Sequence, residues 1–551
     1  MNRVDTALAW LLGLLGTAGA AVSAWAIPRA GIGWDAGIDT YAAIDVRDIP
    51  AGSSLNEAYE SVYSTSEFYG VLVQWAGDLL GVLAGGSAPL SPSSASTYQL
   101  QAAVTLVLVV AGTAVAAWTV AYLMNSRIAG LFVWAAALTV PLMVGLSVVD
   151  FKDSPIAAAL LMVSSGASLL WVRRSSRILT AGTLFIAAGT FIGLGVRIGS
   201  WPLIGAIIVA SLIASILWAL LARGRVSVMR TVLAPAAGVG LGLVGIVILH
   251  PIARIDLPRW AFDAFAISRS YPWVGTIRTL GRDLSSSELP WWYLPVWFAA
   301  LMPILFSILI AVGVLFWFIS VGQALRKIRV NPDERASGVN ADPPGAVTLL
   351  PFAVQALVLP IGLVVLGATL YDGIRHVAFA IPALVVLSAP MVAAAVSGSD
   401  TRSITRERLR LGVVILVVAV PIANLIGAIR WFPYMYAHVN VVVASLDSGR
   451  DWEYDYWGTT VIEGANRLRE LGATDVVVSP SIDARGIAEV AQLIPADRLE
   501  HGQEYGLYVF YRYDAQIPDD ECERVFTIAR GGITLGEGAL CEVPSRAKSE
   551  G

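Results

Sequence analysis

The sequence is poor in three residue types that many functional sites need. Its 551 residues include only two cysteines, four histidines and three lysines. Both cysteines, Cys522 and Cys541, fall in the polar tail, which excludes a Cys-rich metal site and allows one disulfide at most. His376 has no second histidine or cysteine at a zinc-ligand spacing. We therefore predict no metal site built from these residues.

Charged residues are also scarce, at 14% of the chain, whereas a soluble protein has about 25%. The net charge is -4, and no basic stretch is long enough to follow a phosphate backbone, which excludes nucleic acid as a partner. Hydrophobic residues make up 56% of the chain, and the mean hydropathy is +0.69. This composition predicts a polytopic α-helical membrane protein with membrane lipids as partners.

About eleven apolar runs are long enough to span a bilayer. Short arginine-rich loops alternate with loops that hold acids and aromatic residues, so the positive-inside bias places the N-terminus in the cytoplasm and the tail outside. The first run is either an uncleaved anchor, which its length favours, or a signal peptide cut near Ala24-Trp25-Ala26. The runs are residues 6–27, 103–124, 128–149, 155–172, 178–198, 202–221, 231–250, 293–318, 347–370, 374–396 and 410–430.

Two acids follow the first span, at the start of an outer loop at residues 28–101. Asp35 and Asp39 lie beside Trp34 in a glycine-rich stretch, and an indole suits the membrane interface. A solvated loop tip is the alternative interpretation of the two acids. Further along this loop, Ser54-Leu-Asn-Glu57 is a capping-box pattern, which predicts the start of a helix.

The second outer turn, Asp150-Phe-Lys152-Asp153-Ser-Pro155, places polar residues between the ends of two spans. Pro155 can begin the next span, where its missing N–H costs nothing. The turn is either a mutually neutralised structural cluster or an acid pair with a cation poised for an anionic headgroup.

Arginines are frequent in the outer loop at residues 251–292, against the topology bias. Such an exception indicates an anion, and a lipid phosphate fits because arginine can bind it through two hydrogen bonds. The alternative is that these arginines pair with acids of the same loop. The loop contains Arg254, Arg259, Arg269, Arg278 and Arg282, and Arg197 at the outer end of the fifth span belongs to the same set.

A polar segment, Tyr371-Asp372-Gly-Ile-Arg375-His376, lies between the ninth and tenth predicted spans on the outer side. A charged group at a span end is costly unless it is paired or functional. The segment therefore forms either an ion pair with a neighbour or part of a functional site.

The polar tail, residues 438–551, is predicted to form a small extracytoplasmic α/β domain after a transmembrane domain at residues 1–437. Cys522 and Cys541 flank a hairpin with Arg530-Gly-Gly at its turn. In an oxidising compartment we expect a disulfide between them, worth about 2–4 kcal/mol. The tail pattern predicts helices at 458–471 and 485–494 and strands at 475–479 and 505–512.

Taken together, these segments resemble the bacterial GT-C glycosyltransferases of the protein-mannosyltransferase and aminoarabinose-transferase type, which use a phospholipid-carried sugar. Five motifs match in the expected order, over most of the chain and on the predicted outer side. Ala36 follows Asp35 where this group commonly has a second acid, and Asp39 is the expected substitute. The motifs are Gly31-Ile-Gly-Trp34-Asp35, Phe151-Lys152-Asp153-Ser-Pro155, Glu288-Leu-Pro-Trp-Trp-Tyr293-Leu-Pro295, Tyr371-Asp-Gly-Ile-Arg375-His376 and Asp455-Tyr-Trp-Gly458.

The resemblance implies inverting transfer of a sugar from a polyprenyl phosphate to a hydroxyl of an envelope glycan, lipid or protein. Asp35 is the expected general base, because a carboxylate at a partly desolvated interface can have a raised pKa. Asp39 and Asp153 are further catalytic candidates. The donor phosphate would be bound by Lys152, Arg197, Arg282, Arg375 and His376, and Trp34, Asp150, Glu288, Tyr293 and Asp372 complete the candidate site.

The resemblance also implies an enzyme of the bacterial plasma membrane that uses no cofactor. A divalent metal at Asp35, Asp39 and Asp150 is the less favoured alternative. A transporter or lipid flippase is the rival function, although a transporter is expected to place polar or broken-helix features near the middle of the membrane. An inactive assembly partner with the same fold is a third interpretation, and it would tolerate the loss of the Asp35 carboxylate.

Overall fold

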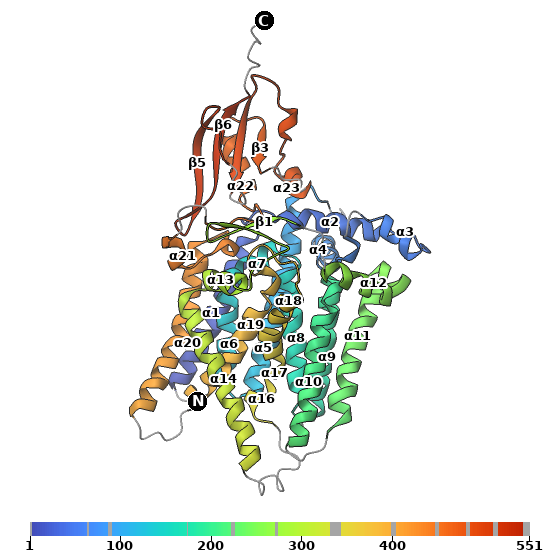
Figure 1. Ribbon diagram of the computed structural model, residues 1–551, viewed down its shortest axis with the longest axis vertical. Coiled ribbons are helices and arrows are strands. Elements are labelled where there is room, and N and C mark those ends of the chain that lie inside the picture. Colours follow the sequence, from blue (N-terminus) through green and yellow to red (C-terminus); the bar gives the residue numbers. More distant parts are fainter. Residues whose placement is uncertain are drawn as a thin grey trace.

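The chain folds into a helix bundle that carries a small β-sheet domain at one end, as Figure 1 shows. In this computed structural model the N-terminal end of α1 (Arg3–Ala26) lies at the opposite end of the bundle from that domain. The expected polytopic helical fold with a C-terminal α/β unit is confirmed. The structure describes residues 3–62, 66–85, 91–172, 175–221, 226–269, 271, 274–330, 343–397, 404–446, 451–480, 485–510 and 516–543.

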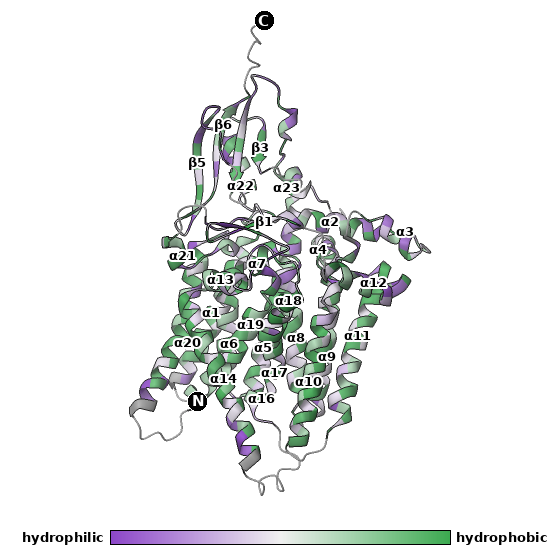
Figure 2. Ribbon diagram, viewed as in Figure 1, coloured by the Kyte–Doolittle hydropathy of each residue, from purple (hydrophilic) through white to green (hydrophobic). Residues whose placement is uncertain are grey.

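Eight helices in the described part of the chain are long and apolar enough to cross a membrane, or nine with one bent pair. Their apolar residues form the band of green ribbon in Figure 2. The protein is therefore a multi-pass membrane protein, and the predicted count of eleven spans is not confirmed. The eight are α1, α5 (Ala95–Leu123), α8 (Asp153–Leu170), α9 (Ser176–Val196), α10 (Trp201–Leu221), α11 (Ala234–Leu249), α14 (Ile304–Val330) and α20 (Ile404–Arg430).

Four of the eleven predicted spans, including the one that contains α14, are broken or shorter, because prolines and polar segments interrupt them. The span at 128–149 is two helices, α6 (Arg127–Thr139) and α7 (Pro141–Val149), bent by 62° where Pro141 lacks the N–H that would continue α6. The span at 293–318 is divided into α13 (Tyr293–Leu301) and α14. The other two become α16 (Gly345–Thr348), α17 (Leu350–Ala353), the π-helical turn η4 (Val354–Val358), α18 (Leu359–Val365) and α19 (Ala380–Val396).

Helix α8 is the central element, since its whole length is buried. Small residues let its neighbours approach closely: a Cβ added at Gly112 of α5 would lie 2.8 Å from Ala158, and one at Gly189 of α9 would lie 2.5 Å from the Ala159 oxygen. The charged turn that precedes α8 is therefore held at the N-terminal end of a fully buried helix.

Several short elements cover the end of the bundle that carries the sheet domain (Figure 1). The predicted capping box is confirmed, because Ser54 Oγ accepts the Glu57 N–H at 3.3 Å and Glu57 Oε2 accepts the Ser54 N–H at 2.6 Å. The predicted loop at 251–292 contains a helix and a hairpin. These elements are α2 (Trp34–Arg47), α3 (Leu55–Glu60), the 3-10 turn η1 (Ser66–Phe68), α4 (Leu72–Leu83), α12 (Pro251–Arg269), β1 (Thr276–Thr279) and β2 (Arg282–Ser285).

The C-terminal domain is a four-stranded sheet in the order β3-β4-β6-β5, with α22 (Val461–Glu470) and α23 (Arg485–Val490) beside it. Strands β3 (Val476–Ser479) and β4 (Glu504–Phe510) are parallel, whereas β4, β6 (Ile533–Glu542) and β5 (Cys522–Arg530) are antiparallel. Gly531 and Gly532 both have positive φ, as the tight β5–β6 turn requires. The predicted helices, strands and hairpin of the tail are confirmed to within a few residues.

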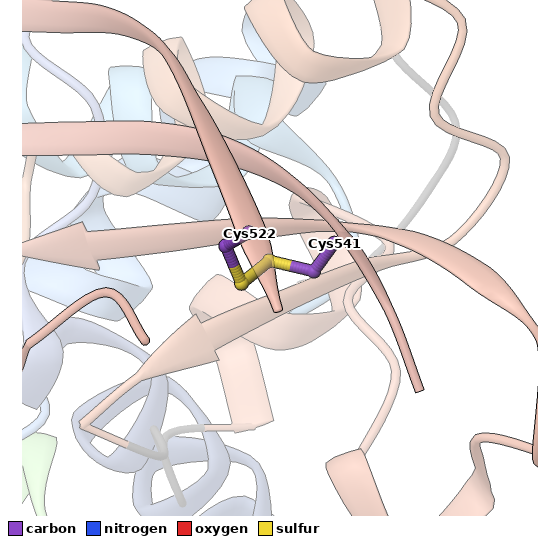
Figure 3. Close-up of a disulfide and its surroundings, with 2 residues drawn as sticks. All are labelled: Cys522 and Cys541. Carbon is purple, nitrogen blue, oxygen red and sulfur yellow. A yellow bond between two sulfur atoms is a disulfide. The ribbon is translucent and has the colours of Figure 1, made fainter. Parts of the chain in front are cut away.

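The predicted disulfide joins β5 to β6, as Figure 3 shows. Cys522 and Cys541 are directly opposite in the strand register, and their Cα atoms are 4.1 Å apart. The bond closes the hairpin at the end away from its turn.

Candidate functional site

The loop that carries the first acidic motif is pressed between α7 and the segment that follows the bundle. A Cβ at Gly31, where φ is +69°, would collide with the Thr459 carbonyl, and one at Gly33 would lie 2.9 Å from the Val149 oxygen. Helix α2 begins directly after this loop, and the Trp34 N–H donates to the Trp457 carbonyl at 3.0 Å. The glycines thus fix where α2 starts.

Asp35 and Asp39 lie one helical turn apart on the same face of α2, with Lys152 between them. The Lys152 ammonium is 3.1 Å from Asp35 Oδ2 and 3.2 Å from Asp39 Oδ1. The side chain of Asp35 is 29% exposed, whereas that of Asp39 is only 3% exposed. The Tyr69 ring also faces Lys152, at 4.5 Å from Nζ. Asp35 is therefore the carboxylate that a second molecule can reach.

Asp150 organises the turn before α8 through its backbone contacts. Its Oδ1 accepts the N–H groups of Lys152 and Asp153, each at 2.9 Å. Burial raises the pKa of Asp150 to about 7, with a further contribution from Asp153. These bonds aim Lys152 toward α2, so Asp150 acts as a cap for the first turn of α8 in this arrangement.

Arg375, in the 3-10 turn η5 (Arg375–Val377), ties the remaining acids together. Its guanidinium lies 3.0 Å from Asp35 Oδ2, 3.0 Å from Asp372 Oδ2 and 4.0 Å from Asp153 Oδ2. Arg197 pairs with the other oxygen of that carboxylate, Asp153 Oδ1, at 3.6 Å. The structure therefore brings three predicted cations and four predicted acids into one network. We call the set Asp35, Asp39, Lys152, Asp153, Arg197, Asp372 and Arg375 the charge cluster.

The electrostatics of the charge cluster differ from the expectation for Asp35. Burial alone would raise the pKa of Asp35, but attraction to Lys152 and Arg375 outweighs it and holds that pKa well below its usual range. The predicted raised pKa of Asp35 is wrong for this arrangement of charges. Burial instead raises the pKa of Asp39 to about 6, because Lys152 offsets only part of the cost of an ionised carboxylate there.

The pKa values of Lys152 and His376 are shifted in opposite directions. Burial lowers the pKa of Lys152, but Asp35 and Asp39 together hold it well above the usual value, so the ammonium stays charged. Burial and then repulsion from Arg375 keep the pKa of His376 well below its usual value. His376 packs edge-on against Tyr371, with ring centroids 4.6 Å apart. As a neutral ring, it can donate a hydrogen bond to a phosphate but supplies no positive charge.

Two predicted residues have no described contact with the charge cluster. Arg282 and Glu288 are exposed, and within the described residues no ion pair or hydrogen bond joins either one to it. Two other arginines of the segment at 251–292 pair with acids of that segment, as the alternative interpretation predicted. Arg278 pairs with Asp283 at 3.0 Å, and Arg259 lies 3.7 Å from Asp263. Arg254 bonds the Val247 and Ile248 carbonyls, and the side chain of Arg269 lies outside the described residues.

The predicted aromatic residues have supporting positions. Tyr293 is buried, and its hydroxyl accepts the Gly373 N–H at 3.1 Å, which holds the turn between Asp372 and Arg375. Trp34 is half-buried against the bundle core. Sequence reasoning missed Tyr69, because nothing in its own segment marks it as a neighbour of Lys152.

In the described part of the chain, no three His, Cys, Asp or Glu side chains are grouped so as to hold a metal ion. The Lys152 ammonium lies between the Asp35 and Asp39 carboxylates. Metal independence stays a prediction.

A cavity of about 560 Å³ lies behind the glycine loop, between helix α22, the C-terminal ends of α1 and α7 and the N-terminal end of α5. Its floor includes Ile32, Val149 and Phe151, and its other side includes Glu463 and Arg467. Asp35 does not line it, although Gly33 does, so the loop at Gly31–Gly33 separates this cavity from the charge cluster.

Comparisons with known proteins leave the family open. No protein-family model and no curated protein matches the chain. The chain is similar to a crystal structure of ArnT from Cupriavidus metallidurans bound to undecaprenyl phosphate, with 12% identity, a TM-score of 0.47, and coverage of 96% of this chain and 97% of that one. It is also similar to the apo oligosaccharyltransferase of Archaeoglobus fulgidus, with 11% identity, a TM-score of 0.46, and coverage of 90% of this chain and 64% of that one. Neither likeness assigns a family or an activity.

Proposed function

We propose that this protein is a membrane glycosyltransferase that moves a sugar from a polyprenyl phosphate to a hydroxyl group at the outer face of the bacterial plasma membrane. The observation that carries the proposal is the position of Asp35, an accessible carboxylate whose Oδ2 lies 3.1 Å from Lys152 and 3.0 Å from Arg375. A base beside two cations suits the removal of a proton next to a departing phosphate. The motifs described above, with their resemblance to GT-C enzymes, support the same reaction class.

In the proposed reaction, the acceptor oxygen attacks the anomeric carbon of the sugar and its proton passes to the Asp35 carboxylate. The bond between the anomeric carbon and the phosphate oxygen breaks, and polyprenyl phosphate leaves with the electron pair. Attack from the face opposite the phosphate inverts the anomeric centre. Lys152 and Arg375 stabilise the charge on the leaving phosphate, and no covalent sugar intermediate is needed.

The low pKa of Asp35 is compatible with this role once a phosphate shares its cations. An anion bound by Lys152 and Arg375 takes part of the attraction that now holds the Asp35 pKa down, so that pKa rises when the donor binds. The base is then strongest in the complex that reacts. Asp39 is the second candidate base, with a pKa of about 6, but its burial leaves little room for an acceptor.

The proposed phosphate site is formed by Lys152, Arg197 and Arg375. Arg197 is 26% exposed and, among the described residues, has one ion pair, at 3.6 Å, so it can turn toward an incoming anion. Lys152 and Arg375 are more buried and provide fixed charge. Arg282 is withdrawn from this proposed site because no described contact joins it to the charge cluster.

The test is transfer of labelled sugar by the purified protein, from a panel of polyprenyl-phosphate sugars to extracted envelope acceptors. Asp35→Asn should lower the rate by at least about 100-fold, which is the lower range for a lost general base. Asp48→Asn is the matched control, because Asp48 follows the other end of α2 and is exposed. Equal rates in wild type and Asp35→Asn would contradict the role of Asp35.

A transporter or flippase is the second candidate, and broken helices favour it. The α6–α7 pair bends by 62°, and η4 places the buried Gln355 within a predicted span, where it bonds Ser164 at 2.8 Å. Movement of a labelled polyprenyl-phosphate sugar across vesicles, without transfer to any acceptor, would favour this candidate. Transfer that depends on Asp35 would exclude it as the main function.

A further inference from the structure

Trp457 reaches the charge cluster from the segment that connects the bundle to the sheet domain. Its side chain is buried, and the guanidinium of Arg375 lies over its ring at 5.1 Å. The Tyr371 ring is also close, at 4.7 Å from the same guanidinium. Arg375 thus contacts two aromatic rings, which restrict the plane of the group that faces Asp35.

The backbone of Trp457 contacts the start of α2, the helix that carries Asp35, whereas its ring contacts Arg375. Its carbonyl accepts the Trp34 N–H at 3.0 Å, which is the first N–H of α2 and adjoins Asp35 in the chain. The indole also packs against the glycine loop, because a Cβ at Gly33 would be 3.8 Å from Trp457 Cδ2. One residue therefore contacts both elements that form the Asp35–Arg375 ion pair.

Trp457 is itself held by a dense set of contacts around Asp455. The buried Asp455 carboxylate accepts the Thr459 N–H at 2.9 Å, the Thr460 N–H at 3.1 Å and the Tyr436 hydroxyl. The Tyr436 ring lies 5.5 Å from the Trp457 ring. This segment is anchored to the bundle, since a Cβ at Gly145 of α7 would collide with the Tyr436 backbone.

The guanidinium of Arg375 depends on this support. Its Nη1 and Nη2 atoms reach Asp35 and Asp372, whereas its Nε has no hydrogen-bond partner among the described residues. The ion pairs to Asp35, Asp372 and Asp153 are all made by the Nη atoms, at one end of a planar group, and leave it able to tilt. The two aromatic faces remove that freedom.

We propose that Trp457 is a positioning residue for the transfer reaction: its indole keeps Arg375 against Asp35, so the segment that leads into the sheet domain completes the active site. The inference rests on the proposed function. Trp457 touches no reacting atom in this proposal and acts through Arg375 and α2.

The expected effect of losing the indole is on the ionisation of Asp35. The charged groups that face Asp35 are Lys152, Arg375 and, across Lys152, Asp39. Asp372 and Asp153 face it only through Arg375, and the Tyr69 and Tyr371 rings pack against the cations. If Arg375 tilts away while Lys152 stays, one of two attractions is lost and the Asp35 pKa rises.

The test compares pH–rate profiles for sugar transfer by wild type, Trp457→Leu and Trp457→Phe. In Trp457→Leu the acid limb of kcat/KM should move to higher pH by about one unit, the lower range for loss of a nearby opposite charge. Trp457→Phe keeps a smaller aromatic face and should move the limb less, in the same direction. Trp452→Leu is the matched control: Trp452 is buried nearby, packs edge-on against Trp297 with ring centroids 4.8 Å apart, and should leave the limb in place.

Two results would overturn the inference: an unchanged acid limb in a folded Trp457→Leu or Trp457→Phe, or an equal shift in Trp452→Leu. A merely structural role for Trp457 would lower the amount of active enzyme without moving the limb.

A second readout does not need activity, so it separates this inference from the proposed function. Thermal midpoints are measured for Trp457→Leu, Asp35→Asn and the double variant. If Trp457 supports the Asp35–Arg375 pair, the two changes are non-additive, with the double variant more stable than the sum predicts. The pair Trp452→Leu and Asp35→Asn should be additive. Additivity in the first pair overturns the inference, whereas wild type without transfer activity but with this coupling overturns only the proposed function.

Discussion

Replacing Lys152 with methionine removes the cation that lies between two carboxylates, at 3.1 Å from Asp35 and 3.2 Å from Asp39. Removal of one partner from a buried ion pair costs about 3–5 kcal/mol, because a buried charge is left without compensation. The lower end applies here, since Asp35 is partly exposed and can regain water. We expect Lys152→Met to lower the free energy of unfolding by about 3 kcal/mol at pH 7.

The same variant should regain stability as the pH falls. Without Lys152, one of the two acids takes up a proton on folding, which costs about 1.4 kcal/mol less for each unit of lower pH. In the wild type, the pKa of Asp39 is raised to about 6, so this carboxyl is mostly protonated only below pH 6. The difference between the two proteins should therefore shrink by about 1 kcal/mol from pH 7 to pH 6.

The assay is unfolding of the purified protein in mixed micelles with an increasing fraction of denaturing detergent, at both pH values. Lys152→Met combined with Asp39→Asn should recover most of the loss, because the buried unpaired charge is gone. Lys152→Arg, which keeps the charge, is the control. A Lys152→Met variant as stable as wild type would refute this account of the charge cluster. So would a loss of unfolding free energy that changes neither with pH nor on adding Asp39→Asn.

Three further predictions concern ionisation, donor binding and the glycine loop. The acid limb of kcat should lie at higher pH than that of kcat/KM, because a bound donor phosphate shares the cations that hold down the Asp35 pKa; coincident limbs would contradict this sharing. Arg197→Gln should raise the KM for the donor by about 10-fold or more, the range for a lost charged hydrogen bond, whereas Arg282→Gln should change it by less than about 2-fold; equal effects would argue against the assigned phosphate site. Gly31→Ala should lower the thermal midpoint more than Gly52→Ala, since both glycines have positive φ but only the first would collide with a neighbour, and equal losses would show that the collision is relieved.

The sequence identified most of the charge cluster because charge at the end of an apolar span has few uses. Asp35, Lys152 and Arg375 each stand out from apolar flanks, and a charge in that position must pair or react. They do pair in the structure. Asp35 and Asp39 are four residues apart, and because the segment is helical from Trp34, this spacing places both side chains on one face of α2.

The same reasoning failed where one pattern fits two arrangements. An arginine-rich outer loop looks the same whether its arginines bind an anion or pair locally, and the hairpin at 276–285 pairs Arg278 with Asp283. Tyr69 and Trp457 could not be placed beside Lys152 and Arg375, because single-sequence patterns do not bring distant segments together. The apolar pattern at 128–149 also did not reveal that Pro141 divides the run into two helices.

The most direct test of the central claim is a single-turnover measurement of sugar transfer from enzyme already loaded with donor, in Asp35→Asn and Asp39→Asn. Preloading removes donor binding from the rate, so the measurement reports the step in which the hydroxyl loses its proton. The account predicts a loss of at least about 100-fold in Asp35→Asn and less than about 10-fold in Asp39→Asn. The reverse order, or transfer at the wild-type rate in Asp35→Asn, would contradict it.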